Sequence, residues 1–431
     1  MSSPLATATA KRAAVVLVLL AVFAAGCGSS VGAAADPDAP PGGSSGACAP
    51  TVLGVLGDVA MRVYNEGVAS ERTEVALRLV ARSIPLREAV EHDNSRAARS
   101  AAVALLATGH LTNLTVLRGK ETLIDVGAAN ALTPLHGSIL SAKGLPIASF
   151  VTSVWADGGF IDEMQGVAEG DVALREGSHT IPGSFALPAG ELPPAGTFSK
   201  HGAAYQYTSF PATVYPSGGS LRVYLLRSVR STASLCGPTA QDTLVNTLSH
   251  IAHLIYAGEG GARALVQVHR VQRNQALLSA VANRDPNATR LAIDSLLHQH
   301  IVRLRVSAGG HLLADVGGPY VLAPVTAALR LDGRQIGSLV LSIQDDEGYL
   351  RLTRRLADLH VLMYMSPTLS STRPTHSSML VKNSLGPDPG NVPASGLYHY
   401  RGHTFRVFTL HARSFPSGPL RILVLVPIPY S

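Results

Sequence analysis

The stretch Cys48-Ala-Pro-Thr51 opens a series of landmarks that the chain repeats, and it returns as Cys236-Gly-Pro-Thr239 about 190 residues later. Further landmarks return in the same order: Ile124-Asp-Val-Gly127 as Ala314-Asp-Val-Gly317, Leu132-Thr-Pro134 as Leu322-Ala-Pro324, Val154-Trp-Ala-Asp157 as Ile343-Gln-Asp-Asp346, and Tyr215-Pro-Ser-Gly218 as Phe415-Pro-Ser-Gly418. Similarity in a fixed order at one long spacing indicates a duplicated domain, because solenoid periods are about 20 to 50 residues. The sequence therefore predicts two copies of one fold, module 1 (residues 48–235) and module 2 (residues 236–431).

The composition is that of a folded protein without a polyanionic partner. Hydrophobic residues make up 46% of the 431 positions and charged residues 15%, which is typical of a globular chain. The formal net charge is +6, and the basic residues form no run. A charge that is small and dispersed argues against nucleic acid as a partner.

The first 27 residues have the pattern of an export signal. Lys11-Arg12 is followed by the apolar run Ala13–Ala25 and then by Gly26-Cys27. The run is shorter than the roughly 20 residues that a membrane-spanning helix needs, so we expect cleavage. The residues from Ala24 to Cys27 resemble the lipobox of bacterial lipoproteins, in which the cysteine carries the lipid, palmitate included. The alternative is an ordinary secretory leader that contains a cysteine.

The expected mature chain begins with a flexible segment. Residues 28–47 are rich in Gly, Ser, Ala and Pro, a composition typical of a tether. A lipid on Cys27 would hold the protein at the outer face of the bacterial cytoplasmic membrane. Disulfides persist outside the cytoplasm, and Cys48 and Cys236 begin the two modules at equivalent positions, so we expect them to be bonded. The alternative is two buried free thiols.

Each module begins with a helical pattern and then changes to the alternation of strands. Apolar residues recur at helical spacing from Val52 to Val63 and from Leu244 to Ile255. Strands, a helix and a closing hairpin then follow. The predicted strands are 112–116, 123–126 and 147–154 in module 1 and 302–306, 312–316 and 336–343 in module 2, and residues 178–200 and 367–394 are predicted loops.

This order resembles the Cache family, the extracytoplasmic relatives of PAS domains. The resemblance is clearest in module 2, in these segments: Leu277-Leu-Ser-Ala280, Asp285, Leu296-Leu297, Val302–Val306, Gly309-Gly-His-Leu312, Gly337–Ser342, Asp345-Asp346 and Gly348-Tyr349. It implies an α+β fold, with two tandem PAS-like modules that each pack a long N-terminal helix on an antiparallel sheet.

The resemblance also implies a sensor that holds a small molecule between the sheet and its covering loops. The polar and aromatic residues expected at the open end of the sheet are Asp315, Tyr320, Asp345, Asp346 and Tyr349 in module 2 and Asp125, Trp155, Asp157 and Phe160 in module 1. Members of the family usually feed a membrane-spanning helix and a kinase or chemotaxis output. We expect no such output here, so a membrane receptor or kinase is the expected partner.

The motifs of other chemistries are missing from the sequence. It has no Gly-x-Ser-x-Gly motif at a strand-to-helix turn, no His-Glu-x-x-His motif and no Cys-x-x-Cys pair, although it contains 16 histidines. We therefore predict no enzyme activity, no metal and no cofactor. Adjacent carboxylates such as Asp345 and Asp346 also have a structural interpretation, because they can cap the helix that follows.

Two further functions stay open. The protein could be a structural or protein-interaction lipoprotein whose Cache-like pockets are filled by side chains, and the absence of a suitable cavity would favour it. A hydrolase or redox enzyme would require clustered titratable groups with shifted pKa values in a cleft. A transporter-type solute-binding protein is disfavoured, because strands and helices do not alternate regularly.

Overall fold

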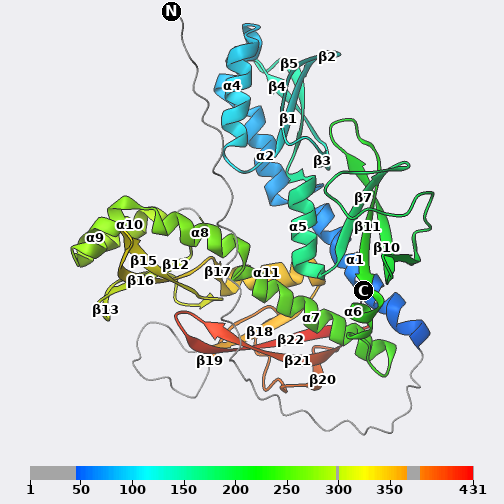
Figure 1. The fold of residues 1–431 in the computed structure, drawn as a ribbon, viewed down its shortest axis with the longest axis vertical. Coiled ribbons are helices and arrows are strands. Elements are labelled where there is room, and N and C mark those ends of the chain that lie inside the picture. The colour runs from blue at the N-terminus through cyan, green and yellow to red at the C-terminus, as the bar shows by residue number, and fades with distance from the viewer. Residues whose placement is uncertain (1–44, 298–299, 366–378, 431) are drawn as a thin grey trace, which may run out of the picture. The chain divides into compact units, whose positions relative to one another are not determined.

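The two modules repeat one order of helices and strands in the computed structural model, which describes residues 45–297, 300–365 and 379–430 (Figure 1). The helices of module 1 are α1 (Ser45–Asn65), α2 (Glu71–Ala81), α3 (Ile84–Glu91), α4 (Ser95–Leu106), α5 (Asp157–Ala168) and α6 (Val229–Ala233). Those of module 2 are α7 (Ala240–Glu259), α8 (Ala262–Gln272), α9 (Gln275–Ala282), α10 (Pro286–Leu297) and α11 (Asp346–Ala357). The predicted leader, Cys27 and the tether up to residue 44 lie outside the described residues.

The strands also correspond between the modules. Module 1 contains β1 (Asn113–Arg118), β2 (Glu121–Gly127), β3 (Ala131–Leu132), β4 (Leu135–Leu140), β5 (Pro146–Ser153), β6 (Trp155–Ala156), β7 (Asp171–Glu176), β8 (His179–Thr180), β9 (Ala195–Lys200), β10 (Ala203–Val214) and β11 (Gly219–Ser228). Module 2 contains β12 (Arg303–Ala308), β13 (His311–Gly317), β14 (Val321–Leu322), β15 (Val325–Leu331), β16 (Arg334–Ser342), β17 (Gln344–Asp345), β18 (His360–Met365), β19 (Met379–Asn383), β20 (Gly396–Tyr400), β21 (His403–Ser414) and β22 (Gly418–Ile428).

Each module holds two antiparallel sheets. The small sheet has the order β2-β1-β5-β4 in module 1 and β13-β12-β16-β15 in module 2. The large sheet has the order β6-β3-β10-β11-β7-β8 with β9 on β10, and module 2 repeats it as β17-β14-β21-β22-β18-β19 with β20 on β21. The predicted fold class, α+β with two tandem modules of the same build, is confirmed.

The presence of two sheets in a module corrects one detail of the prediction, which assigned one sheet to each. The hairpin and the longer strand form the small sheet, and the closing hairpin belongs to the large one. The sequence pattern missed the short strands β3 and β6 of the large sheet, because a strand of two residues shows no alternation. The end of the predicted loop 178–200 is also a strand, β9, whose Thr197 pairs with Gln206.

The long first helix packs on the large sheet in both modules. α1 contacts β10 and β11, and α7 contacts β21 and β22. Its apolar stripe is buried, because Val52, Leu56 and Val59 are 0% exposed. α1 begins at Ser45, inside the range predicted as a tether.

Short helices cover the small sheet. In module 1, α2 contacts β4 and α4 contacts β2, and Figure 1 shows both helices against this sheet. Each of these helices begins at a residue whose side chain caps its first turn. Ser70 and Thr73 form a capping box at α2, Ser83 caps α3 and Asn94 caps α4, which satisfies backbone N–H groups that the first turn leaves open.

The two modules are joined covalently. Cys48 of α1 and Cys236, which precedes α7, form a disulfide with a Cα–Cα distance of 5.6 Å. α1 and α7 also pack against each other, and residues 43–431 form one compact unit. The predicted pairing is confirmed, whereas the position of the module boundary stays a prediction.

Candidate functional site

The predicted site residues of module 2 meet at the start of α11, where they have structural partners. Asp345 is the N-cap, and its Oδ1 accepts from the backbone N–H of Gly348 at 2.7 Å. The backbone N–H of Asp346 donates to the carbonyl of Tyr320 at 3.1 Å, and burial raises the pKa of the Asp346 carboxyl. Tyr349 is 0% exposed, and its hydroxyl donates to the carbonyl of Ala252 in α7 at 2.9 Å. These residues fasten α11 to the sheet and to α7.

The equivalent residues of module 1 surround the start of α5. Asp157 accepts from the side-chain amide of Asn130 at 3.2 Å and from the backbone N–H of Gly158 at 2.8 Å. Trp155 and Phe160 pack edge to face with ring centroids 6.0 Å apart. The guanidinium of Arg72 lies 4.8 Å from the centroid of the Trp155 ring, so the tryptophan is enclosed by its own module.

Asp315 lies apart from that group, on β13 of the small sheet. Both of its carboxylate oxygens accept from Arg303, at 2.8 and 2.9 Å, and Oδ2 also accepts from Arg305, at 2.6 and 2.9 Å. Burial acts to raise the pKa of Asp315, but the hydrogen bonds and charges of both arginines outweigh it and hold that pKa below its usual value. The two guanidinium groups lie 5.0 and 5.7 Å from the ring centroid of Phe415.

Asp125 is the counterpart of Asp315 in module 1 and has neutral neighbours. The hydroxyl of Thr115 donates to Asp125 Oδ1 at 2.9 Å and lies 2.7 Å from the hydroxyl of Tyr215. That tyrosine donates in turn to the carbonyl of Val151 at 3.1 Å, and burial raises its pKa to about 12. Asp315 is therefore held by four hydrogen bonds within its own module, whereas Asp125 is exposed and accepts one from Thr115.

The space between the large sheet and its covering loop is filled by side chains in both modules. In module 1, Tyr207 and Tyr224 of the sheet are 1% and 3% exposed, and they pack with Phe185, Leu187, Leu192, Phe198 and Tyr205. Neighbouring rings in this cluster have centroids 5.1 to 6.3 Å apart. In module 2 the same space holds Leu362, Val392, Phe405, Val407, Leu423 and Leu425, with Tyr398 and Tyr400 beside them.

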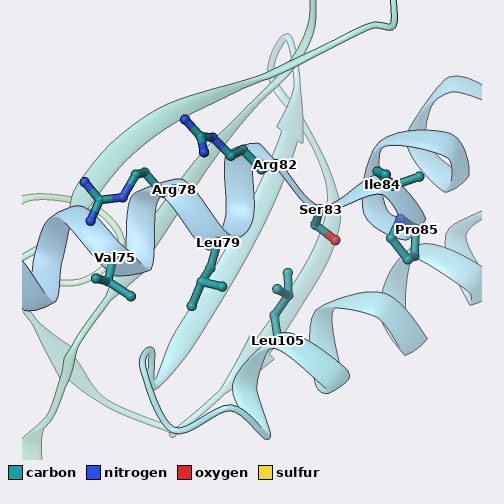
Figure 2. Close-up of a pocket in the computed structure, with 8 residues that line it drawn as sticks. All are labelled: Val75, Arg78, Leu79, Arg82, Ser83, Ile84, Pro85 and Leu105. Atoms are coloured by element: carbon teal, nitrogen blue, oxygen red, sulfur yellow. The ribbon is translucent and has the colours of Figure 1, made fainter.

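Open cavities lie instead among the short helices. The first, which we call groove 1, has a volume of about 510 Å³. Figure 2 shows Val75 and Leu79 of α2 facing Leu105 of α4, and the side chains of Arg78 and Arg82 extending away from Leu105 at the edge of the groove. Its lining residues are Val75, Arg78, Leu79, Arg82, Ser83, Ile84, Pro85 and Leu105.

A second cavity, groove 2, recurs at the equivalent place in module 2. Its volume is about 710 Å³, and its lining residues are Val266, His269, Arg270, Arg273, Asn274, Ser295 and Leu296. Val266, Asn274 and Leu296 occupy the positions of Val75, Ser83 and Leu105, because α8, α9 and α10 correspond to α2, α3 and α4. Asn274 caps α9 as Ser83 caps α3.

None of the residues predicted for ligand binding lines either groove. The sequence patterns do not show which sides of the short helices face solvent. In the structure, Ile84, Val266 and Leu291 are apolar residues at 53%, 62% and 71% exposure. The sequence signal for them is limited to apolar residues that lie near arginines.

Charged side chains also form a cluster where the two modules are in contact. Glu169, which follows α5, lies 3.0 Å from Nε2 of His250 in α7, and Glu66 pairs with Arg355 of α11 at 2.6 Å. Glu163 of α5 pairs with Arg263 of α8. Burial raises the pKa of Glu259 to about 7; the nearby charge of Arg263 lowers it and that of Glu163 raises it.

Within the described ranges, no group of three or more His, Cys, Asp or Glu side chains is arranged to hold a metal ion. In the same ranges, no helix combines the length and apolar character that crossing a bilayer requires.

Comparisons with known proteins give weak similarities. No protein-family model and no curated protein sequence matches the chain. Among solved structures, two crystal structures of the periplasmic domain of Vibrio cholerae LuxQ are 9% identical, with a TM-score of 0.26. They cover 42% and 43% of this chain and 98% of that domain. An extracellular ligand binding receptor from Desulfohalobium retbaense is 10% identical with a TM-score of 0.18, over 55% of this chain and 47% of the receptor. We draw no conclusion about function from similarities of this size.

Proposed function

We propose that this protein is an extracytoplasmic binding protein, anchored by a lipid on Cys27, that acts as a sensory accessory and has no enzyme activity. It would hold its ligand at the tandem modules and report binding to a separate membrane receptor or kinase. The export pattern of the first 27 residues supports the location, as does a disulfide of the kind that persists outside the cytoplasm.

The recurrence of one cavity in both modules carries the proposal of a binding role. Grooves 1 and 2 lie among equivalent helices and have volumes of about 510 and 710 Å³. Ligand sites in proteins are concave, mostly apolar, and about 300 to 1,000 Å³ in volume. The hollow is kept at the same place in both modules although several of the side chains that line it differ.

A thermal-shift screen tests the binding role. The chain from Gly28 to Ser431 would be heated with small carboxylates, amino acids and purines at millimolar concentration. A compound that binds the folded state raises the melting temperature by mass action. At a free concentration of a hundred times its Kd, the compound stabilises the folded state by about 2.7 kcal/mol. A flat screen would remove the small-molecule sensor and leave the second candidate below.

The second candidate is a structural or protein-interaction lipoprotein. The filled space between each large sheet and its covering loop favours it, because the Cache resemblance locates the ligand there and Tyr207 and Tyr224 occupy it. Pull-down with the anchored protein from its own membranes distinguishes the two candidates, since only this one requires a stable protein partner without any small ligand.

The anchor has its own test. Labelled palmitate should be incorporated into the full-length chain and not into Cys27→Ser. An ordinary secretory leader would instead leave both proteins unlabelled and free in the medium.

A further inference from the structure

We propose that grooves 1 and 2 are docking sites for an acidic amphipathic segment of a partner protein. This inference rests on the proposed binding role and names the occupant of the cavities. The occupant is a protein segment with apolar residues on one face and carboxylates beside them.

The apolar part of groove 1 has the shape that such a segment needs. Val75 and Leu79 lie one helical turn apart on α2, and Leu105 faces them from α4 (Figure 2). Ile84, at 53% exposure, continues the apolar surface at the start of α3. The cavity of about 510 Å³ has room for the three or four apolar side chains that two turns of an amphipathic helix present on one face.

The charged side chains around groove 1 are cationic. Arg78 and Arg82 line its edge. Arg78 also pairs with Glu74 at 3.2 Å, but these side chains are 51% and 68% exposed. An exposed pair of this kind contributes at most about 1 kcal/mol, so a carboxylate of a partner can replace Glu74 at little cost.

Groove 2 keeps the location and is also lined by two arginines. His269, Arg270 and Arg273 of α8 line it, with Val266 at 62% exposure beside them. The guanidinium of Arg270 donates to the carbonyl of Leu296 and so spans from α8 to α10. Leu291, at 71% exposure, lies one turn before Ser295 on α10 and extends the apolar surface.

Charge complementarity therefore selects the partner. Every charged residue that lines either groove is basic, and Glu74, which pairs with Arg78, does not itself line the groove. An acidic amphipathic helix supplies both the apolar face and the carboxylates, and complementary charges at the edge of an interface speed association and fix the orientation. Two such sites on one chain would also bind a partner with two segments more tightly than either site alone.

A peptide binding assay tests the proposal. The probe is a fluorescein-labelled peptide designed as an amphipathic helix, with leucine at i, i+3, i+4 and i+7 and glutamate on both flanks. Its anisotropy is measured with the chain from Gly28 to Ser431, and a peptide with lysine in place of glutamate is the control. We expect the acidic peptide to bind and the basic peptide to bind at least about tenfold more weakly.

Matched variants assign the binding to the grooves. The groove variant combines Arg78→Gln, Arg82→Gln and Arg273→Gln, all at exposed positions. The control variant combines Arg96→Gln, Arg99→Gln and Arg290→Gln, which are exposed on α4 and α10, outside the grooves. The net change in charge is the same. We expect about tenfold weaker binding for the groove variant and an unchanged affinity for the control.

Three results would overturn the inference: equal binding of both peptides, equal loss in both variants, or no binding at all. Phosphatidylglycerol vesicles are a further arm. If they bind through the groove arginines while the peptide does not, the occupant is a lipid surface and the protein partner is wrong. A ligand found by the thermal-shift screen together with failure of the peptide would remove this inference and leave the proposed function standing.

Discussion

Asp125 and Asp315 occupy the same position in the two modules but have opposite surroundings. In module 1 the carboxylate accepts from the hydroxyl of Thr115, which in turn contacts Tyr215, all without a formal cation. The module therefore closes the junction of its two sheets with hydroxyl hydrogen bonds and no arginine.

Module 2 closes the same junction with charge. Arg303 and Arg305 hold Asp315 between them, and both guanidinium groups lie over Phe415. The strand register is the same, since Thr115 pairs with Asp125 and Arg305 with Asp315. The same backbone arrangement therefore tolerates two different sets of polar partners for the aspartate. We infer that the apolar pattern and the turns specify the fold, and that these polar residues adjust its stability.

The bond that joins the modules gives the largest expected effect. Cys48→Ser with Cys236→Ser opens a loop with a sequence separation of 188 residues, and the chain-entropy model predicts a loss of about 5 kcal/mol in the free energy of unfolding. Urea denaturation of the variant and of the reduced parent measures it. An unchanged denaturation midpoint would mean that the packing of α1 on α7 alone holds the modules together.

The two aspartates give the next largest effect. Asp315→Ala leaves Arg303, whose side chain is 4% exposed, without its counter-charge, which should cost about 3 kcal/mol or more. Asp125→Ala removes one hydrogen bond from a hydroxyl to an exposed carboxylate and should cost about 1 kcal/mol. Chemical denaturation of both variants side by side checks the difference, and equal losses would contradict the contrast between the modules.

Glu259 makes the contact between the modules dependent on pH. Its pKa is raised from 4.5 to about 7, so the folded state binds its proton more tightly than the unfolded state does. Stability from this group is therefore complete below about pH 4.5 and falls as the pH rises through 7. Glu259→Gln should be more stable than the parent by roughly 2 kcal/mol at pH 8 and equal to it near pH 4.

Thermal melts of both proteins across that range provide the measurement for Glu259. Glu163 and Arg263 face the same carboxyl, so Glu163→Gln should reduce the gap at pH 8. A gap that does not change with pH would show that the effect comes from packing and not from ionisation.

The smallest effect is expected when the helix caps of the two modules are exchanged by substitution. Asp345 caps α11 through its side chain, whereas Ala156 holds the same position at α5 and has no side-chain cap. Asp345→Ala should cost about 1 kcal/mol, and Ala156→Asp should gain a similar or smaller amount. Melting temperatures that shift in opposite directions would confirm the exchange; a shift of the same sign in both would refute it.

Most of the fold was predictable from the sequence because its signals are local or repeated. The long helices follow from the spacing of residues such as Val52 and Leu56, and the β1–β2 hairpin follows from alternation before the turn at Gly119. The partition into two sheets was not predictable, since it depends on pairings such as Leu132 with Trp155 in strands of two residues.

The candidate site was much less predictable. Asp345 and Tyr349 were predicted as site residues because of their chemistry. A sequence does not show that the Asp345 carboxylate accepts from the N–H of Gly348, or that the Tyr349 hydroxyl donates to a helix carbonyl. The grooves depend on which side of α2 and α8 faces solvent and on where α4 and α10 pack beside them. That arrangement is tertiary, and only the exposed apolar residues among arginines hinted at it.

The pairing of Cys48 with Cys236 joins equivalent landmarks of two copies. A bond of this kind is one that two separate copies of a single module could also form with each other, as partners across a twofold axis. Because both copies lie in one chain, such a crosslink forms within a single molecule and does not depend on protein concentration.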